Sequence, residues 1–274
     1  MKNKYIKNMC AVAVALTVTA TSFAGESTKA LKTGSLGFSE KASDIISGKL
    51  SVDVVNAYVF RGVLQDKNMA VQPTLTIGAP VELGLGLDAS VVKFTTLQSF
   101  HQSAPVEGWM RSNVDLGIAL TKGDFTVTPS YQFFNSPNAS FTAGQGINVR
   151  VDYADKGLFG LPALNPYANA FFTTSGRVGN GPRGGNYYEV GIAPSTKVGT
   201  TTVSLPVALG LGSRGYYASN DTYGYTSVGL QSLTPLADRV DLRAGVTYTN
   251  SSNGINGPSN QNIWTTSVGL GVSF

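Results

Sequence analysis

The sequence predicts an all-β protein, a transmembrane, antiparallel, up-and-down β-barrel of twelve strands. Three observations lead to this fold class. Apolar and polar residues alternate with a period of two over most of the chain. Charged residues make up only 13% of the 274 residues, whereas glycine is abundant at 32. Short and long connections also alternate along the chain. Because successive side chains of a strand point to opposite faces, such strands would turn an apolar face to lipid and a polar face to a lumen.

The first 24 residues are interpreted as a secretory signal peptide and take no part in the fold. Lys2, Lys4 and Lys7 precede an apolar stretch over 9–18, and the segment 22–24 before Gly25 resembles a cleavage site with a small residue, Ala24, at the cut. The apolar stretch is too short to span a bilayer. The formal charge of +4 includes these three lysines, so that of the mature chain is 4 − 3 = +1. This balance gives no reason to expect nucleic-acid binding, which requires a clustered basic face.

Residues 25–48 are expected to form a periplasmic leader, and residues 49–274 the barrel. The single cysteine, Cys10, lies inside the signal peptide. The mature chain is therefore expected to lack disulfides, thiolate metal sites and cysteine nucleophiles. No later segment offers about 18 consecutive apolar residues, so the sequence predicts no transmembrane helix.

Alternation of apolar and small polar residues defines the strands. The twelve predicted strands are 49–61, 70–78, 83–94, 107–120, 124–134, 143–153, 165–174, 186–196, 201–212, 222–233, 239–249 and 262–274. Pro73, Pro129, Pro194 and Pro206 fall within them and cannot donate a ladder hydrogen bond. Each is expected to mark a bulge or a strand end, and ten strands is the alternative count. A soluble β-sandwich also alternates, but its strands are usually shorter and its exposed faces richer in Lys and Glu.

Charged residues in the strands occur almost entirely in the polar phase, because Arg or Lys facing lipid near the midplane costs about 2–4 kcal/mol. Lys93 is the exception and is expected near a rim. The residues predicted to line the lumen are Asp53, Arg61, Asp88, Glu107, Arg111, Asp115, Arg150, Asp152, Glu189, Arg239, Asp241 and Arg243. Two interpretations stay open, and both can hold. The charges brace a narrow interior, or they form a selectivity filter with a transverse field.

Aromatic residues gather near the predicted strand ends. They are interpreted as girdles at the two membrane interfaces, with a sugar-stacking track in the pore as the alternative, most plausibly over 216–225. The Gly-rich stretch 176–185 lacks the ending of a phosphate loop and is expected to be a surface loop. Its Arg177 and Arg183 are candidates for contact with anionic solutes or lipopolysaccharide.

Several segments resemble the TorF-type porins, a family of Gram-negative outer-membrane proteins. The family's opening motif is matched by Tyr58-Val59-Phe60-Arg61-Gly62, but Met69-Ala70-Val71-Gln72 lacks the family's proline. Phe133–Pro137 and Tyr187–Val190 are similar to two further family segments. The match is moderate over 50–137 and thin elsewhere. The resemblance implies an outer-membrane barrel of the porin type and supplies no ligand.

The chain ends on an aromatic residue after an alternating strand. Trp264, Val268, Leu270, Val272 and Phe274 share one face and resemble the recognition signal of the bacterial barrel-assembly machinery. The partners expected are that machinery, outer-membrane lipid with lipopolysaccharide, and small solutes. The expected location is the bacterial outer membrane.

Signatures of enzymes are weak in this sequence. The only histidine, His101, lies in a predicted outer loop beside Ser99 and Ser103, and a lipid hydrolase would depend on it. No metal site or cofactor is predicted. The sequence therefore predicts a non-enzymatic channel for passive diffusion of small hydrophilic solutes. The alternative is a non-conducting scaffold barrel that binds a partner through its loops or leader.

Overall fold

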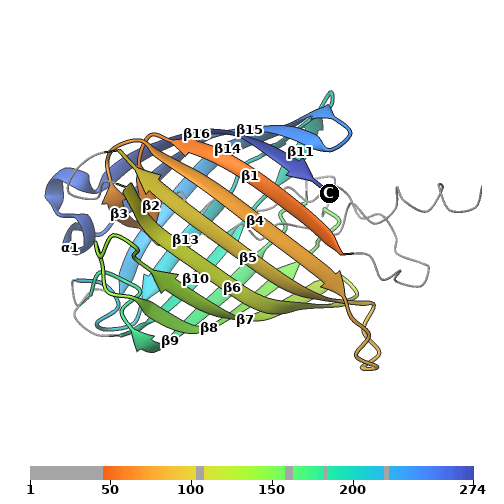
Figure 1. The fold of residues 1–274 in the computed structure, drawn as a ribbon, viewed down its shortest axis with the longest axis horizontal. Coiled ribbons are helices and arrows are strands. Elements are labelled where there is room, and N and C mark those ends of the chain that lie inside the picture. The colour runs from red at the N-terminus through yellow and green to blue at the C-terminus, as the bar shows by residue number, and fades with distance from the viewer. Residues whose placement is uncertain (1–45, 103–107, 158–162, 182–183, 219–221) are drawn as a thin grey trace, which may run out of the picture.

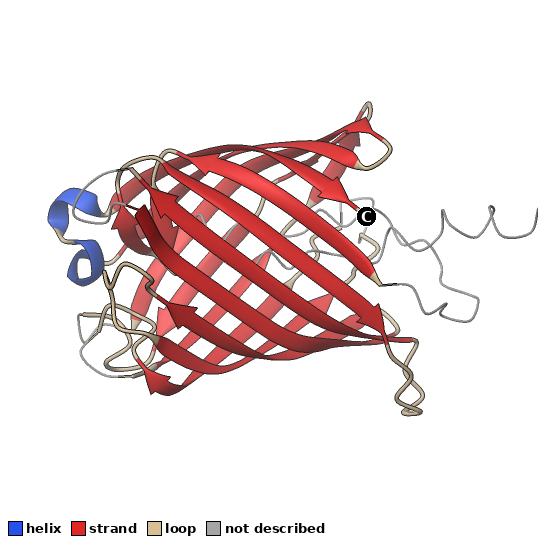
Figure 2. Ribbon diagram, in the orientation of Figure 1, coloured by secondary structure: helices blue, strands red, loops and turns tan. Residues whose placement is uncertain are grey.

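The computed structural model describes residues 46–102, 108–157, 163–181, 184–218 and 222–274. Most of these residues lie in strands that form one closed antiparallel barrel (Figures 1 and 2). The wall consists of β1 (Ser47–Val55), β4 (Ala70–Pro80), β5 (Ala89–His101), β6 (Gly108–Lys122), β7 (Phe125–Asn135), β8 (Gly144–Tyr153), β9 (Tyr167–Gly176), β10 (Asn186–Ile192), β11 (Ser195–Val198), β12 (Thr201–Ser204), β13 (Val207–Gly212), β14 (Tyr223–Ala237), β15 (Val240–Ser251) and β16 (Asn262–Ser273). The predicted signal peptide and residues 25–45 of the predicted leader lie outside the described residues.

Twelve positions make up the wall, which confirms the predicted strand count. β10 and β11 follow each other along one position, as do β12 and β13, so the 14 strands of the sheet occupy 14 − 2 = 12 positions. A separate two-stranded sheet pairs β2 (Tyr58–Phe60) with β3 (Val63–Asp66). The short helices α1 (Asn253–Asn256) and η2 (Pro258–Asn260) follow β15. No helix among the described residues is both long and apolar enough to cross a membrane.

The ring closes where the first wall strand pairs with the last. β1 lies between β4 and β16, with Val52 opposite Leu270. At the end of this seam, the backbone N–H of Gly48 donates to the Phe274 carbonyl at 2.8 Å, and the Phe274 N–H donates to the Gly48 carbonyl at 2.9 Å. The two ends of the barrel domain thus lie at the same rim, which we call the terminal rim. The opposite rim, which carries α1, is the loop rim (Figure 1).

Alternation within the strands separates the two faces of the wall as the sequence predicts. In β1, Leu50 and Val52 are 45% and 42% exposed on the outside, whereas Ser51 between them is 5% exposed and points inward. β16 repeats this pattern, with Val268 and Leu270 about half exposed on the outer face. In a barrel this outer face is the one that lipid would cover.

The observed strand β5 differs from the predicted strand 83–94 in its boundaries and in the side of the wall that Lys93 faces. The predicted strand 83–94 begins six residues too early, because 81–88 forms a turn at the terminal rim and β5 continues to His101. Val92 and Phe100 face outward, and Lys93 is buried inside the barrel rather than placed in the apolar phase. Burial removes water from the Lys93 ammonium group, and attraction to Asp152 and Asp115 offsets part of that cost. The inward position also avoids the free-energy cost of exposing a lysine side chain to lipid.

The four prolines act in two ways. Pro73 and Pro129 lie inside continuous strands, β4 and β7. Pro194 falls between β10 and β11, and Pro206 between β12 and β13, so each splits one wall position into two short strands. The missing N–H group of proline interrupts the ladder there. The Leu205 N–H still donates to the Pro194 carbonyl at 2.9 Å, so the two breaks lie side by side.

Two residues predicted to line the lumen lie instead at the terminal rim. Arg239 occupies the exposed turn between β14 and β15. Asp88 precedes β5, with its side chain 55% exposed beside Lys122. There the Asp88 carboxylate accepts the backbone N–H of Gly123 at 2.6 Å, and this hydrogen bond lowers the pKa of Asp88. Both residues were misplaced because the predicted strands extended into turns.

The seam generates a first prediction. A β-carbon added to Gly48 would lie 2.2 Å from the ring of Phe274, because the ring covers this glycine. Gly48→Leu should therefore displace the Phe274 ring and destabilise the folded barrel by about 1 kcal/mol, the low end of the range for overpacking, because this ring is more than half exposed. The urea midpoint of the barrel in detergent micelles measures the change. Thr266→Leu, on the exposed outer face of β16, is the matched control. Equal midpoints for both variants would contradict the prediction.

Candidate functional site

A hairpin formed by β2 and β3 lies inside the barrel near the loop rim (Figure 1). We call residues 58–66 the luminal hairpin. The predicted strand 49–61 was too long, because β1 ends at Val55 and the chain then turns into the lumen. Tyr58 and Phe60 of the hairpin are 0% and 1% exposed. The Phe60 ring packs edge-on against Phe134 of β7, with centroids 5.5 Å apart.

Arg61 and Gly62 form the two-residue turn at the tip of the hairpin. Their φ angles are 50° and 78°, and positive φ at both central residues is what a type I′ turn requires. Gly62 also allows close packing, since a β-carbon there would lie 2.4 Å from the Tyr225 ring. The segment 58–62, which resembles the opening motif of the TorF-type porins, therefore forms strand β2 and the turn of this hairpin.

The Arg61 side chain attaches the hairpin tip to strand β7 and to the loop that follows β13. Its Nη1 donates to the Tyr216 hydroxyl at 2.9 Å, and its Nη2 donates to Oε1 of Gln132 at 3.0 Å. Its guanidinium carbon lies 4.3 Å and 4.6 Å from the ring centroids of Phe171 and Tyr187. Gln132 in turn donates to Asp115 at 2.6 Å. Hydrogen bonds and cation–π contacts thus replace the water that a buried guanidinium loses.

Arg111 reaches the same region from the wall strand β6. It is 2% exposed, and its guanidinium carbon lies 3.7 Å from the Phe60 ring centroid and 4.8 Å from that of Phe141. Its Nε donates to Oδ1 of Asn113 at 3.0 Å. Arg61 and Arg111 therefore both contact Phe60, and the two positive charges repel each other.

These contacts belong to one buried cluster, which we call the aromatic cluster. Most of its members are aromatic side chains from the hairpin, the wall and the loops. It consists of Tyr58, Phe60, Val63, Leu97, Met110, Phe134, Phe171, Val178, Tyr187, Tyr216, Tyr217, Tyr225 and Ile255. The prediction of an interfacial girdle is wrong for the aromatic members at 58, 60, 216, 217 and 225. Tyr131, Tyr188 and Trp264 face outward as it expects.

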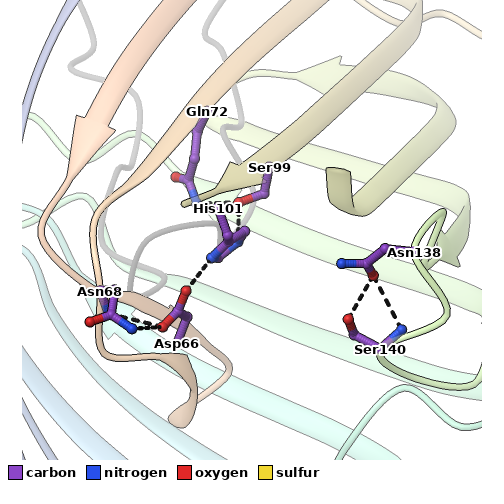
Figure 3. Close-up of polar contacts among 7 residues, drawn as sticks. All are labelled: Asp66, Asn68, Gln72, Ser99, His101, Asn138 and Ser140. Atoms are coloured by element: carbon purple, nitrogen blue, oxygen red, sulfur yellow. Dashed lines mark hydrogen bonds and ion pairs between the residues drawn. The ribbon is translucent and has the colours of Figure 1, made fainter. Parts of the chain in front are cut away.

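A row of polar side chains holds the other strand of the hairpin to the wall (Figure 3). Oδ2 of Asp66 lies 2.6 Å from Nδ1 of His101, and Nε2 of His101 lies 2.9 Å from the Ser99 hydroxyl oxygen. Gln72 of β4 donates to the same hydroxyl at 3.4 Å. The sequence predicts His101 in an outer loop, whereas it is the last residue of β5 and points inward. The alternation of 93, 95, 97, 99 and 101 on one face carried the signal that the strand continues.

This row has the order of an acid–base–nucleophile triad, yet its position favours a latch. The side chains of His101 and Asp66 are 0% and 4% exposed, and Ser99 is 0% exposed. Asp66 belongs to the luminal hairpin, whereas His101 and Ser99 belong to β5. Movement of the hairpin would therefore separate the acid from the other two side chains. We interpret Asp66 and His101 as the latch between the hairpin and the wall.

Loops at the loop rim bind the hairpin through the side chains of Asn256 and Tyr217. Nδ2 of Asn256, in α1, donates to the Gly62 carbonyl at 2.7 Å, and Oδ1 of Asn256 accepts the Leu64 N–H at 2.8 Å. The Tyr217 hydroxyl donates to the Arg61 carbonyl at 3.0 Å. The hairpin edge, which pairs with no wall strand, thus obtains hydrogen bonds from loop side chains.

Glu189 is bound by three tyrosines on the inner wall. The hydroxyl of Tyr167 donates to its Oε1, and those of Tyr187 and Tyr225 donate to its Oε2, each at 2.6 Å. Tyr225 also covers Gly62, so this carboxylate fixes an aromatic ring that supports the hairpin tip. Glu189 is 3% exposed.

The remaining predicted lumen charges lie toward the terminal rim and form pairs. Lys49 contacts Asp241 at 2.7 Å, and Arg243 contacts Asp53 at 3.0 Å. On β8, Nη2 of Arg150 lies 2.6 Å from Asp152. Glu107 and Arg183 lie outside the described residues. The structure thus brings Arg61 and Arg111 together near the loop rim, separates them from this paired group, and adds Lys93, Asp66 and His101 to the lumen.

Among the described residues, no group of three His, Cys, Asp or Glu side chains could hold a metal ion. No protein-family profile matches the chain, and no curated protein sequence does either. The resemblance to the TorF-type porins therefore stays a prediction.

Solved structures share the barrel fold. An outer-membrane channel from Pseudomonas putida F1 superposes with a TM-score of 0.53 at 10% identity, over 84% of this chain and 96% of that one. The NanC porin gives 0.49 at 13% identity, over 82% and 98%. Outer-membrane phospholipase A from Escherichia coli gives 0.42 at 13% identity, over 82% and 92%. Identities this low show the fold alone.

The tyrosine-bound carboxylate generates a second prediction. Glu189→Gln removes the charge that the three hydroxyls solvate and turns one acceptor into a donor. The free energy of unfolding should fall by about 1.5–3 kcal/mol, as expected for hydrogen bonds to a charged group. Urea titration in micelles measures it. Glu82→Gln, in an exposed rim turn, is the matched control, and a Glu189→Gln midpoint equal to that of the control would contradict the prediction.

Proposed function

We propose that this protein is a gated channel of the bacterial outer membrane for passive diffusion of small hydrophilic solutes. The loop rim faces outward and the terminal rim faces the periplasm. The luminal hairpin is the gate. A single observation carries the proposal: near one rim, a polar, charged lumen holds a buried chain segment that hydrogen bonds attach to the wall.

The lumen on the terminal side of the hairpin suits hydrophilic solutes. Its wall carries charges of both signs, Lys49 with Asp241 and Arg243 with Asp53. Beside Lys49, Thr76 of β4 and Thr95 of β5 add hydroxyl groups to the inner wall. Such a wall can replace part of the hydration of a passing solute.

The hairpin has the attachments expected of a movable element. It forms no ladder with the barrel, since β2 pairs only with β3. Asp66, Arg61 and the Gly62 carbonyl hold it through side-chain hydrogen bonds. These can break without disturbing the closed ring of strands, so opening does not require the barrel to unfold.

The outer face and the C-terminus support insertion by the barrel-assembly machinery, with lipid and lipopolysaccharide around the wall. The side chains of the proposed recognition signal are all exposed on the outer face of β16 or at its end. Phe274 lies at the seam, where pairing with Gly48 completes the ring.

A non-conducting scaffold is the second candidate. The observation that favours it is the filling of the lumen by the aromatic cluster, whose largest side chains are fully buried. In that case the hairpin is a permanent brace, and function resides in the loops.

Planar-bilayer recording separates the two candidates and gives a third prediction. Asp66→Ala and His101→Ala each break the latch, which as a buried charge-assisted hydrogen bond is worth about 1.5–3 kcal/mol. The ratio of open to closed states should rise at least tenfold in either variant, with stepwise openings. The double variant should open little more than each single one, because both lose the same bond.

Asp155→Ala at the terminal rim is the matched control, since this aspartate caps a local turn and contacts no part of the hairpin among the described residues. It should record like the unmodified protein. If no variant conducts at high protein load, although the barrel is verified as folded, the channel is rejected and the scaffold is favoured.

A further inference from the structure

We propose that Arg111 is a binding site for small organic monocarboxylates, uncovered when the luminal hairpin withdraws. The inference rests on the proposed channel and deepens it, because it names the class of solute that the channel selects. Arg111 belongs to the fixed wall, whereas the ring that covers it belongs to the gate.

The first step is the charge of Arg111. Its guanidinium stays protonated at any physiological pH. Its Nε bonds to the neutral Asn113. No described carboxylate lies within ion-pair distance of it, in contrast to Arg150 and Arg243, which each contact an aspartate. One positive charge of the inner wall is thus left without an opposing charge.

In the folded protein, the ring of Phe60 covers the Arg111 guanidinium. Phe60 lies 3.7 Å from the guanidinium carbon and is the nearest ring to it. Phe60 is placed there by the hairpin, which the latch and the contacts of Arg61 hold in position. Withdrawal removes Phe60, and with it the repelling charge of Arg61. The wall arginine then faces an aqueous lumen.

The third step is the chemistry of the uncovered site. A guanidinium binds a carboxylate through two parallel N–H···O bonds. Phe134, Phe171 and Tyr187 face the same part of the lumen, and their rings already pack against the two arginines. They offer stacking surfaces to the body of a solute. One arginine balances one charge, so a monocarboxylate with a flat or apolar body fits best.

The test uses benzoate and its neutral isostere benzamide on the full mature chain with the latch broken by Asp66→Ala. Benzoate should reduce the single-channel current at concentrations at which benzamide does not. Arg111→Gln should weaken the benzoate effect at least tenfold. Arg111→Lys should restore only part of it, since lysine keeps the charge but loses the planar fork. Arg214→Gln, in an exposed turn after β13, is the matched control and should leave the effect unchanged.

Binding is measured in parallel by titration calorimetry in micelles, which does not require conduction. If the channel conducts but benzoate and benzamide act alike, or if Arg111→Gln retains the benzoate effect, the site is rejected and the channel stands. If no variant conducts but benzoate binds in an Arg111-dependent way, the channel is rejected and the site stands. Calorimetry without Arg111-dependent binding overturns the inference whatever the conductance.

Discussion

The structure depends on one constraint, the absence of water inside a bilayer. A backbone that crosses lipid must pair every N–H and C=O group within itself, and a sheet satisfies this only when its edges meet. Here they meet between β1 and β16, from Val55 opposite Ser267 down to Gly48 and Phe274. The two-residue alternation follows from this closure, because a closed wall gives each strand one face for lipid and one for the lumen.

A ring of twelve strand positions encloses more space than the wall side chains can fill. Eight strands enclose an interior that side chains can fill, whereas larger barrels leave space. This chain fills part of that space with its own first loop. The hairpin can lie in the lumen because Gln132, Tyr216, Tyr217, Asn256 and His101 satisfy its polar groups. Phe60 and Tyr58 supply its apolar contacts.

The lumen therefore has two halves of different chemistry. Toward the terminal rim, acids and bases neutralise each other at short distances, within β8 or between β1 and β15 across β16. Toward the loop rim, two arginines are surrounded by aromatic rings, and the main carboxylate, Glu189, is engaged by phenols. In the proposed channel, the paired half would be the path for solutes, and the aromatic half would hold the gate and the proposed site at Arg111.

Sequence alone determined what depends on local periodicity: the barrel class, the twelve wall positions, the outward apolar face and the side of the wall on which Arg111, Asp115, Arg150 and Glu189 lie. These follow because a strand fixes the direction of each side chain relative to its neighbours. Only the tertiary structure decided which alternating segment lies in the lumen rather than in the wall. Residues 58–61 are predicted as the end of the first wall strand, but β2 leaves the wall and pairs with β3 inside the lumen. The pairing of Asp66 with His101, 35 residues apart, and the gathering of Tyr216, Phe171 and Arg61 depend on ring closure. Closure brings distant loops over one opening, and no local pattern encodes that distance.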